Sequence, residues 1–412
     1  MSEFTEISAA SLQTPERAST PSLTTRLLVL NALSFTLIYL TTNWLAAAHQ
    51  VSQHLMLAAD AVIPLIPWMI IPYSSSLVLF IFIFYHCGTQ QQCRQYSLQI
   101  FTATHLAGMC FLLMPLRQQH AAVLPEGWLG YAFQSLYLMD QRYNQLPSLH
   151  VAYAVIFWFH LRTAMRTVAA RLLFNAGIAL LIASTLFTHQ HHLADVIAGA
   201  ALGWLCIWRC KPHDAPPVAA YYRIAAAWLA ALALYFQQLW LFLLTAATLP
   251  CLLLVAQAYA RSDRHFLHKH QGQHPVWVRL LYAPYLAGYR LSWLLQRYLL
   301  QPSIRIQRIT PLLAIGPRLL SAEINQLHPA GVVIDLSAEM PEHPALCDPL
   351  AGSTKRYLHY PLLDILPPTP QQMQELAALI LPLLKAGTPV YLHCAMGFHR
   401  CRHIARYLNS NL

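Results

Sequence analysis

The sequence predicts a polytopic all-α membrane bundle followed by a small α/β domain. Hydrophobic residues make up 57% of the chain and charged residues only 10%, proportions that lie outside the range of soluble globular domains. Long apolar runs recur up to about residue 260, and short β-rich runs replace them from about residue 301. A chain of 412 residues also exceeds one compact domain, which favours a bundle with a second module.

The apolar runs predict about eight transmembrane helices, since one crossing takes roughly 20 predominantly apolar residues. Six runs approach that length, and one longer uncharged stretch can cross twice, with Gln237 and Gln238 at its tip. These runs are at about 27–48, 68–87, 98–116, 146–161, 172–190, 193–208 and 224–260. A single crossing by the last stretch is the alternative.

The basic residues predict the orientation of the bundle. With the N-terminal tail inside, the outer loops hold only Arg117 and Arg142, and the other basic residues of the membrane region fall in cytoplasmic segments. The formal charge of +10 is scattered and forms no dense patch, so no nucleic-acid partner is expected. No cysteine falls in an outer loop, and the sequence therefore predicts no disulfide framework.

We divide the chain into five segments. The region between Pro275 and Tyr298 mixes tryptophan, leucine and arginine, which predicts an amphipathic helix at the membrane interface; an ordinary linker is the alternative. The segments are a disordered cytoplasmic tail without a cleaved signal peptide (1–22), a membrane core (23–210), an additional transmembrane hairpin (211–260), an interfacial linker (261–300) and the short α/β domain (301–412).

Two polar clusters interrupt the apolar runs of the bundle. The first is Pro147-Ser148-Leu149-His150, and the second runs from Ser184 through His189, His191 and His192 to Asp195. His191 and Asp195 are four residues apart and share one face of a helix if the helix continues through both. The carboxylate can then fix the tautomer of His191 and leave its other nitrogen free as a nucleophile, while His150 protonates a leaving alkoxide.

Two alternatives remain for these clusters. The histidines can lie at the membrane interface without a catalytic role, bound by water and headgroups. A metal can bind His189, His191, His192 and Asp195, but helical spacing directs His192 away from the face that His191 and Asp195 share, and we assign no metal or other cofactor.

The spacing Pro147-Ser148-x-His150 and Ser184-x6-His191-x3-Asp195 resembles the second and third signatures of the type-2 phosphatidic acid phosphatase superfamily, over roughly residues 60–210. The resemblance implies a six-helix lipid phosphatase core in which His191 is phosphorylated, Asp195 orients it and His150 protonates the leaving group. Ser148 and Ser184 then belong to the phosphate-binding set.

Two departures from the family pattern affect phosphate binding. Thr185 stands where the third signature normally has an arginine, and no Lys-x6-Arg-Pro signature precedes Pro147, so Arg117 and Arg142 are the nearest candidates. Such losses are similar to the branch that contains sphingomyelin and inositol phosphorylceramide synthases. Hydrolysis and transfer of a phospho-headgroup therefore both remain open.

A second motif lies near the C-terminus, where His393-Cys394-x5-Arg400 follows a β-rich run and precedes a helix. Backbone N–H groups of the loop, which contains Gly397, together with the helix N-terminus and Arg400 can hold a phosphate. The same field favours the thiolate of Cys394 as a nucleophile, and Asp364 is the candidate general acid. A buried structural cysteine is the alternative.

The order of strand, Asp364, long helix and phosphate loop resembles the dual-specificity protein phosphatases over residues 301–412. The whole arrangement is similar to bacterial inner-membrane fusions of a type-2 phosphatidic acid phosphatase with such a domain, which implies a periplasmic lipid site and a cytosolic C-terminal domain. Cys401 replaces the hydroxyl residue that normally follows the arginine, and about 12 residues remain after Arg400. We therefore expect a truncated domain with a poorly covered sheet face and weak turnover by Cys394.

These patterns together predict a membrane lipid-phosphate phosphatase that acts through a phosphohistidine at the outer leaflet. Its partners are membrane lipids, with a phosphorylated protein or small molecule at the C-terminal domain. The enzymatic alternative is a phospho-headgroup transferase. The non-enzymatic alternative is a membrane-anchored module that senses phosphorylated ligands or docks a partner.

Overall fold

The computed structural model describes residues 18–212, 217–300, 306–328, 331–347 and 356–410. These residues belong to two compact units, Met1–Asp214 and Ala215–Leu412. The expected N-terminal tail lies almost entirely outside the described residues.

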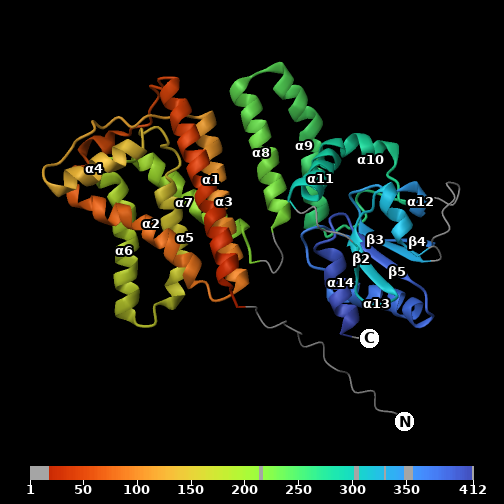
Figure 1. Cartoon of the computed structure of the whole chain (residues 1–412). Coiled ribbons are helices and arrows are strands. Elements are labelled where there is room, and N and C mark those ends of the chain that lie inside the picture. The colour runs from red at the N-terminus through yellow and green to blue at the C-terminus, as the bar shows by residue number, and fades with distance from the viewer. Residues whose placement is uncertain (1–17, 213–216, 301–305, 329–330, 348–355, 411–412) are drawn as a thin grey trace, which may run out of the picture. The chain divides into compact units, whose positions relative to one another are not determined.

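The first unit is a helical bundle built around α5 (Leu149–Leu161), which packs against four neighbouring helices (Figure 1). Residues Val151–Phe157 of α5 are almost fully buried, so this helix forms the centre of the apolar core. The neighbours of α5 are α2 (Ile70–His86), α3 (Gln90–Leu113), α6 (Val168–Phe187) and α7 (Leu193–Arg209). The unit also contains α1 (Pro21–Ala48), η1 (Ala58–Val62), η2 (Pro67–Met69), α4 (Trp128–Met139) and η3 (Arg162–Ala164).

Side-chain caps explain where several of these helices begin. Thr20, Thr89, Ser148 and Thr167 precede α1, α3, α5 and α6, and each side chain accepts a hydrogen bond from a backbone N–H of the first turn. Such caps satisfy donors that have no partner within the helix. Ser148 of the Pro147-Ser148-x-His150 motif therefore also starts the central helix.

Six of the described helices are long and apolar enough to cross a membrane: Pro21–Ala48, Pro67–His86, Gln90–Leu113, Val168–Phe187, Val218–Phe236 and Leu239–Ala260. Eight crossings are not confirmed, because the expected runs at 146–161 and 193–208 form α5 and α7, of 13 and 17 residues. A helix of 13 residues rises about 20 Å, less than the roughly 30 Å of a hydrocarbon core. The apolar residues of α5 face neighbouring helices, so its hydropathy reflects burial inside the bundle.

The second unit begins with the hairpin of α8 (Val218–Phe236) and α9 (Leu239–Ala260). Gln237 adopts a left-handed conformation with φ 50° and Gln238 precedes α9, which confirms these two residues as the connection between the helices. The expected amphipathic segment forms α10 (Val276–Leu281), α11 (Ala283–Leu295) and the π-helical turn η4 (Gln296–Leu300).

A five-stranded sheet of order β1-β2-β5-β3-β4 forms the rest of the second unit. The strands are β1 (Gln307–Arg308), β2 (Leu313–Pro317), β3 (Val332–Ser337), β4 (Arg356–Leu362) and β5 (Val390–Cys394). β1 pairs antiparallel with β2 at one edge, and the other four strands are parallel. The β-rich runs expected at 331–336, 356–363 and 389–393 correspond to β3, β4 and β5. β2 was not expected, and the run at 303–310 is a strand only at its end, with residues 301–305 outside the described part.

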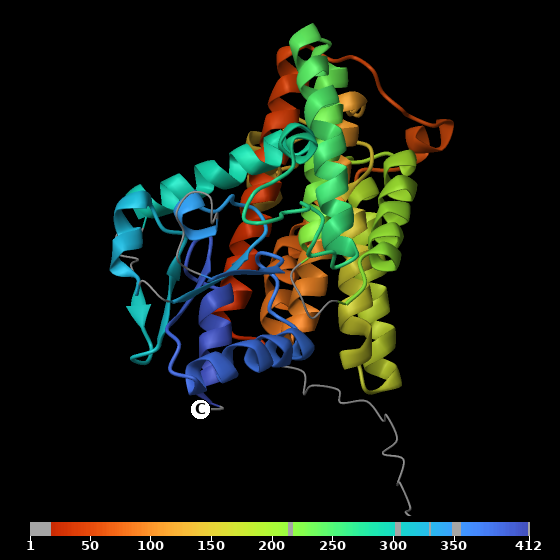
Figure 2. The ribbon, with the colours of Figure 1, turned by 90° about the vertical axis from the view of Figure 1, so that its right-hand side faces the viewer.

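Both faces of this sheet are covered, which contradicts the expectation of a poorly covered face. Helices α13 (Pro370–Lys385) and α14 (Arg400–Asn409) pack against one face, as Figure 2 shows in dark blue. The short helices η5 (Ser321–Gln326) and α12 (Pro344–Cys347) supply apolar side chains to the other. Every residue of β3 and β5 is buried, so the short domain has a complete local core.

Candidate active site

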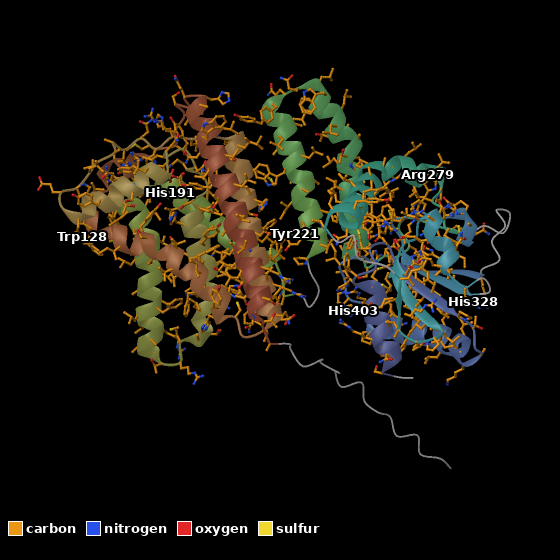
Figure 3. The ribbon with its side chains drawn as sticks, viewed as in Figure 1. Trp128, His191, Tyr221, Arg279, His328 and His403 are labelled. Atoms are coloured by element: carbon orange, nitrogen blue, oxygen red, sulfur yellow. The ribbon has the colours of Figure 1, made fainter. Side chains whose placement is uncertain are left out.

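The turn between α6 and α7 presents His191 in the first unit (Figure 3). The backbone N–H groups of Gln190 and His191 both donate to the carbonyl of Thr185, at 3.1 and 3.0 Å. Helix α7 starts only at Leu193, so the condition of a helix that continues through both His191 and Asp195 is not met. The turn ends at His192, which is the N-cap residue of α7. The backbone N–H of His192 donates to Asp195 Oδ2 at 2.8 Å.

His191 and Asp195 nevertheless lie side by side. His191 Nδ1 is 3.6 Å from Asp195 Oδ2, and both residues are buried, with 5% and 1% of their surface exposed. A carboxylate at this nitrogen favours the tautomer that carries its proton there and leaves Nε2 as a free nucleophile. The distance is slightly long for a hydrogen bond, which is common at catalytic pairs without bound substrate.

His150 completes the group of three that the sequence predicted. It lies in the first turn of α5, its ring centre is 6.3 Å from that of His191, and it stacks on Tyr73 at 4.2 Å. The structure therefore brings together two imidazoles and a carboxylate, the set that the sequence predicted for a nucleophile, its orienting group and a proton donor.

Close contact between α5 and α7 holds these residues in register. A Cβ atom on Gly199 would lie 2.4 Å from the carbonyl oxygen of Ser148, and one on Gly203 would lie 2.7 Å from that of Ala152. The N–H of Ser148 also donates to the carbonyl of Asp195 at 3.0 Å. Glycine at these two positions is thus required for the two signature segments to meet.

We predict that Gly199→Ala lowers the stability of the first unit by about 1–3 kcal/mol, because the new methyl group overlaps backbone atoms that cannot move freely. The backbones of Ser148 and Asp195 should also separate in this variant. Thermal unfolding in detergent measures the stability. Gly177→Ala in α6 is the matched control, because nothing lies within 4 Å of its added Cβ. Equal stability of the two variants would contradict the packing argument.

The expected phosphate-binding residues divide into two kinds. Arg142 NH2 donates to the carbonyl of His189 at 3.0 Å, and its buried Nε has no hydrogen-bond partner, so Arg142 lies beside the turn of His191 with donor capacity to spare. Arg117 is exposed. Ser148 Oγ accepts from Val151 N–H and Ser184 Oγ donates to Leu181 O, so both hydroxyls serve helix structure. Arg142 is thus the best placed of the four for an anion.

Two residues near this turn were missed in the sequence. Asp60 is fully buried and accepts hydrogen bonds from Leu193 N–H at 2.8 Å and Leu57 N–H at 2.7 Å, so it fixes the start of α7. His120 stacks on the ring of His189 at 4.0 Å. Asp60 is the only carboxylate residue between Glu16 and Glu126, and this isolation was a signal that it has a structural or catalytic partner.

The second unit contains the expected strand, loop and helix around Cys394. β5 ends at Cys394 and α14 begins at Arg400. Gly397 has φ +76°, and a Cβ atom there would lie 2.6 Å from the backbone nitrogen of Pro317, so the loop needs glycine at this position. Cys401 Sγ lies 3.6 Å from Cys394 Sγ; this thiol, together with Arg400, lowers the pKa of Cys394 well below its usual range despite burial.

Arg400, at the end of this loop, contacts the side chains of Asp364 and Glu339. Arg400 NH1 donates to Glu339 Oε2 at 2.9 Å, and Arg400 Nε lies 3.5 Å from Asp364 Oδ1. Asp364 follows β4, as the sequence predicted. Burial raises the pKa of Glu339, and the guanidinium of Arg400 opposes that rise. Glu339 therefore fixes the guanidinium from the side away from Asp364.

A cluster of four buried ionisable residues lies beside Cys394. His393 Nε2 is 3.0 Å from Glu342 Oε2 and 3.9 Å from Asp335 Oδ1, and Lys269 Nζ donates to Asp335 Oδ2 at 2.5 Å. Asp335, Glu342 and His393 form the one group with metal-ligand spacing among the described residues. Although burial disfavours its protonated form, the two carboxylates raise the pKa of His393. Two cations then balance two anions, which favours an ion-pair network over a metal site.

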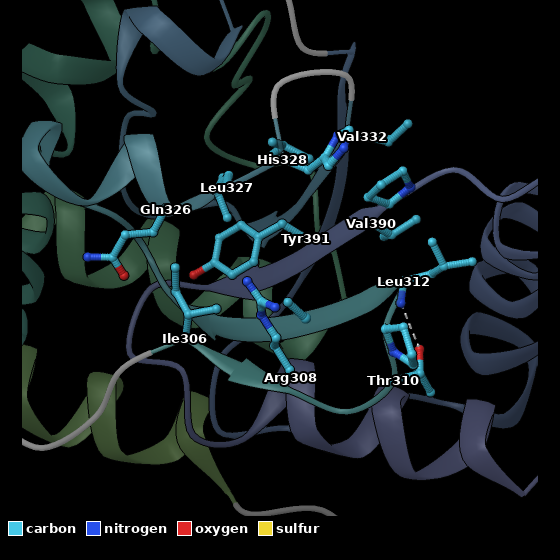
Figure 4. Close-up of a pocket in the computed structure, with 15 residues that line it drawn as sticks. Ile306, Arg308, Thr310, Leu312, Gln326, Leu327, His328, Val332, Val390 and Tyr391 are labelled. Carbon is cyan, nitrogen blue, oxygen red and sulfur yellow. Dashed lines mark hydrogen bonds between the residues drawn. The ribbon is translucent and has the colours of Figure 1, made fainter.

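A cavity of about 150 Å³ in the second unit is separate from the Cys394 loop (Figure 4). Its lining includes Val332 and Val390, the first residues of β3 and β5, whereas Cys394 is the last residue of β5. The cavity therefore lies at the N-terminal ends of β3 and β5, whereas the Cys394 loop follows the C-terminal end of β5. The cavity is not the expected phosphate site.

Comparison with known proteins shows a family similarity in the first unit. Residues 36–209 match the family model described as the PAP2 superfamily. No curated protein matches the chain. The solved crystal structure of a mutant form of Tk-PTP is similar to part of the chain, with 18% identity over 26% of this chain and 81% of that one, and its TM-score of 0.21 does not establish a shared fold. His150, His191 and Asp195 all fall inside residues 36–209, the segment that is similar to the PAP2 superfamily.

Proposed function

We propose that the PAP2-like segment removes phosphate from a membrane lipid through a phosphohistidine formed at His191. The observation that carries this proposal is the buried pair of His191 and Asp195, 3.6 Å apart, with the ring of His150 at 6.3 Å from that of His191. The pair supplies an oriented imidazole, and His150 supplies the proton exchange that a phosphate ester needs.

The reaction has two steps in which bonds and protons balance. Nε2 of His191 attacks phosphorus, the bond from phosphorus to the lipid oxygen breaks, and His150 gives its proton to the departing alkoxide. A water molecule then attacks the phosphohistidine, His150 takes one proton from this water, and the phosphorus–nitrogen bond breaks to release phosphate and free His191. Arg142 binds the phosphate oxygens in both steps.

A lipid substrate is supported by the surroundings of the site. Large apolar side chains are exposed on the long helices, among them Leu33 and Leu37 on α1 and Leu172 and Leu173 on α6, and such surfaces face lipid in membrane proteins. The scarcity of basic residues in the loops that carry Arg117 and Arg142 supports a site at the outer leaflet, on the periplasmic side of an inner membrane. By the same criterion the C-terminal unit is cytosolic.

Transfer of a phospho-headgroup to another lipid is the second candidate function. Thr185 stands in the place of an arginine, and its hydroxyl donates to the carbonyl of Ile182 at 2.8 Å, so this position supplies no charge to a phosphate. Both functions share the first step. The acceptor, water or a hydroxyl lipid, distinguishes them.

For the second unit we propose a phosphate-binding module of cysteine-phosphatase type, whose ligand is a phosphorylated protein or small molecule. The support is the loop from Cys394 to Arg400, with Gly397 in a conformation that L side chains rarely adopt and Asp364 beside the guanidinium. A purely anchoring or docking role would need none of these features.

The test of the lipid function uses the purified full-length protein in vesicles that contain phosphatidic acid labelled in its phosphate. We expect release of labelled inorganic phosphate in the presence of a metal chelator. Addition of a diacylglycerol whose acyl chains differ from those of the substrate separates the two candidates, since a transferase would form labelled phosphatidic acid that carries the new acyl chains. Absence of both products would contradict the proposal.

Alkaline phosphatase fusions after Gln119 should be active and those after Arg166 inactive if the site faces outward.

A further inference from the structure

The hydroxyl group of Tyr289 lies between the two polar groups that a phosphate in the Cys394 loop would use. Arg400 NH2 donates to this hydroxyl at 2.8 Å, and the hydroxyl in turn donates to Asp364 Oδ2 at 2.8 Å. Tyr289 belongs to α11 in the same unit, outside the segment that carries the loop motif. A side chain from a helix distant in the sequence is therefore hydrogen-bonded to both the candidate anion-binding residue, Arg400, and the candidate general acid, Asp364.

The remaining hydrogen bonds of Arg400 show which of its edges is blocked. NH1 donates to Glu339 and to the carbonyls of Leu336 and Leu362, so its hydrogen bonds hold the guanidinium in place. Nε is buried, has no hydrogen-bond partner and faces Asp364 Oδ1 at 3.5 Å. An arginine binds a phosphate with two parallel N–H groups, and here Nε and NH2 are the pair that remains. Tyr289 and Asp364 lie across that pair.

Apolar contacts from the same helix close the loop. Trp293, one turn after Tyr289 on α11, packs in one cluster with Met340 and Ala395, and Tyr289 and Met396 adjoin this cluster. Ala395 and Met396 are the first two residues of the loop after Cys394. Cys394 and Arg400 consequently expose only 2% and 1% of their surface.

α11 is held at both ends within the second unit. Tyr285, one turn before Tyr289, packs with Cys251, Val255 and Tyr259 of α9. After the helix, Arg297 pairs with Glu323. The helix therefore forms a covering element attached to the hairpin on one side and to the sheet domain on the other.

From this geometry we propose that α11 is a closed lid on the Cys394 loop and that Tyr289 is its latch. The inference rests on the proposed phosphate-binding role of the loop. In the closed arrangement the latch hydroxyl takes the place of a ligand oxygen between Arg400 and Asp364. Removing the latch admits a phosphate and small thiol reagents to the loop.

The test measures the rate at which iodoacetamide alkylates Cys394 in the full-length chain, resolved by mass spectrometry and carried out in a His191→Ala background. We expect Tyr289→Ala to speed this reaction about tenfold or more, because two hydrogen bonds and an aromatic contact are lost. Tyr289→Phe, which removes only the hydroxyl, should have a smaller effect of the same sign. Tyr298→Ala is the matched control, because Tyr298 lies in η4 with 58% of its surface exposed.

Cys347 serves as an internal control for folding. It lies in α12 of the same unit, is 7% exposed, and should stay protected in every variant that remains folded. Equal alkylation of Cys394 with and without the latch, while Cys347 stays protected, would overturn the lid.

Inorganic phosphate distinguishes the lid from the proposed ligand. In the Tyr289→Ala chain, added phosphate should slow the alkylation of Cys394, which would support both the lid and the phosphate site. Faster alkylation that phosphate does not slow would support the lid and contradict the phosphate-binding role.

Discussion

Replacing His191 with alanine is expected to lower phosphate release from a lipid phosphate by on the order of 10³-fold or more, since loss of a nucleophile removes the covalent pathway. Asp195 and His150 cannot compensate, because neither offers an oriented nitrogen in the position of His191. The measurement is steady-state phosphate release from phosphatidic acid vesicles by the purified protein.

The control for this prediction is His54→Ala. His54 lies in the first unit but is exposed, and its Nδ1 lies 3.4 Å from the carbonyl oxygen of the nearby Ser52. This variant should keep wild-type activity. Full activity of the His191→Ala protein would refute the phosphohistidine mechanism.

Replacing Lys269 with methionine is expected to destabilise the second unit by about 3–5 kcal/mol, because it leaves a buried carboxylate without its cation. Lys269 and Asp335 side chains are each 1% exposed and their charged atoms are 2.5 Å apart. Burial raises the pKa of Asp335, but Lys269 and His393 outweigh that effect and leave the pKa below its usual range. Hydrogen exchange of the β3 backbone in the full-length protein measures the loss.

The pH dependence of this loss has a definite sign. A carboxyl whose folded-state pKa is depressed contributes stability above its unfolded pKa, about 3.9, and loses it as the pH falls. The difference between the two proteins should therefore persist down to about pH 3.9 and shrink as the pH falls below that value toward the depressed pKa of Asp335. Lys385→Met is the control, because Lys385 is exposed at the end of α13. Equal hydrogen exchange in the wild type and the Lys269→Met protein would contradict the ion-pair account.

Local motifs could be predicted from the sequence because their geometry depends on neighbouring residues. The strand that ends at Cys394, the loop with Gly397 and the helix that starts at Arg400 follow from one short segment. The proximity of His191 and Asp195 was also predicted, although for the wrong reason. The prediction assumed that one helix continues through both residues, whereas the carbonyl of Thr185 accepts from two successive N–H groups and forms a turn.

Contacts between distant segments could not be predicted in the same way. Tyr289 binds residues 75 and 111 positions away, and its own surroundings in the sequence resemble any interfacial helix. Asp60 binds a backbone group 133 positions away. Hydropathy likewise could not separate α5 from a membrane-spanning helix, because burial against protein and burial in lipid require the same apolar residues.

The expectation of weak turnover by Cys394 now has a different physical basis. The sheet is covered on both faces, so incomplete folding is not its cause. Cys401 in place of a hydroxyl residue still removes a group that would help the cysteinyl phosphate break down. The proposed lid adds a second reason, since Cys394 is 2% exposed in the closed arrangement.

The most direct measurement of the central claim is the identity of the phosphorylated residue. The full-length protein is mixed briefly with phosphatidic acid labelled in its phosphate, quenched in base and mapped by mass spectrometry. We predict a base-stable, acid-labile label on His191 that is absent from the His191→Ala protein and persists longer in His150→Ala, which lacks the imidazole that activates water. A label on any other residue, or phosphate release by a protein that never carries label on His191, would contradict the account.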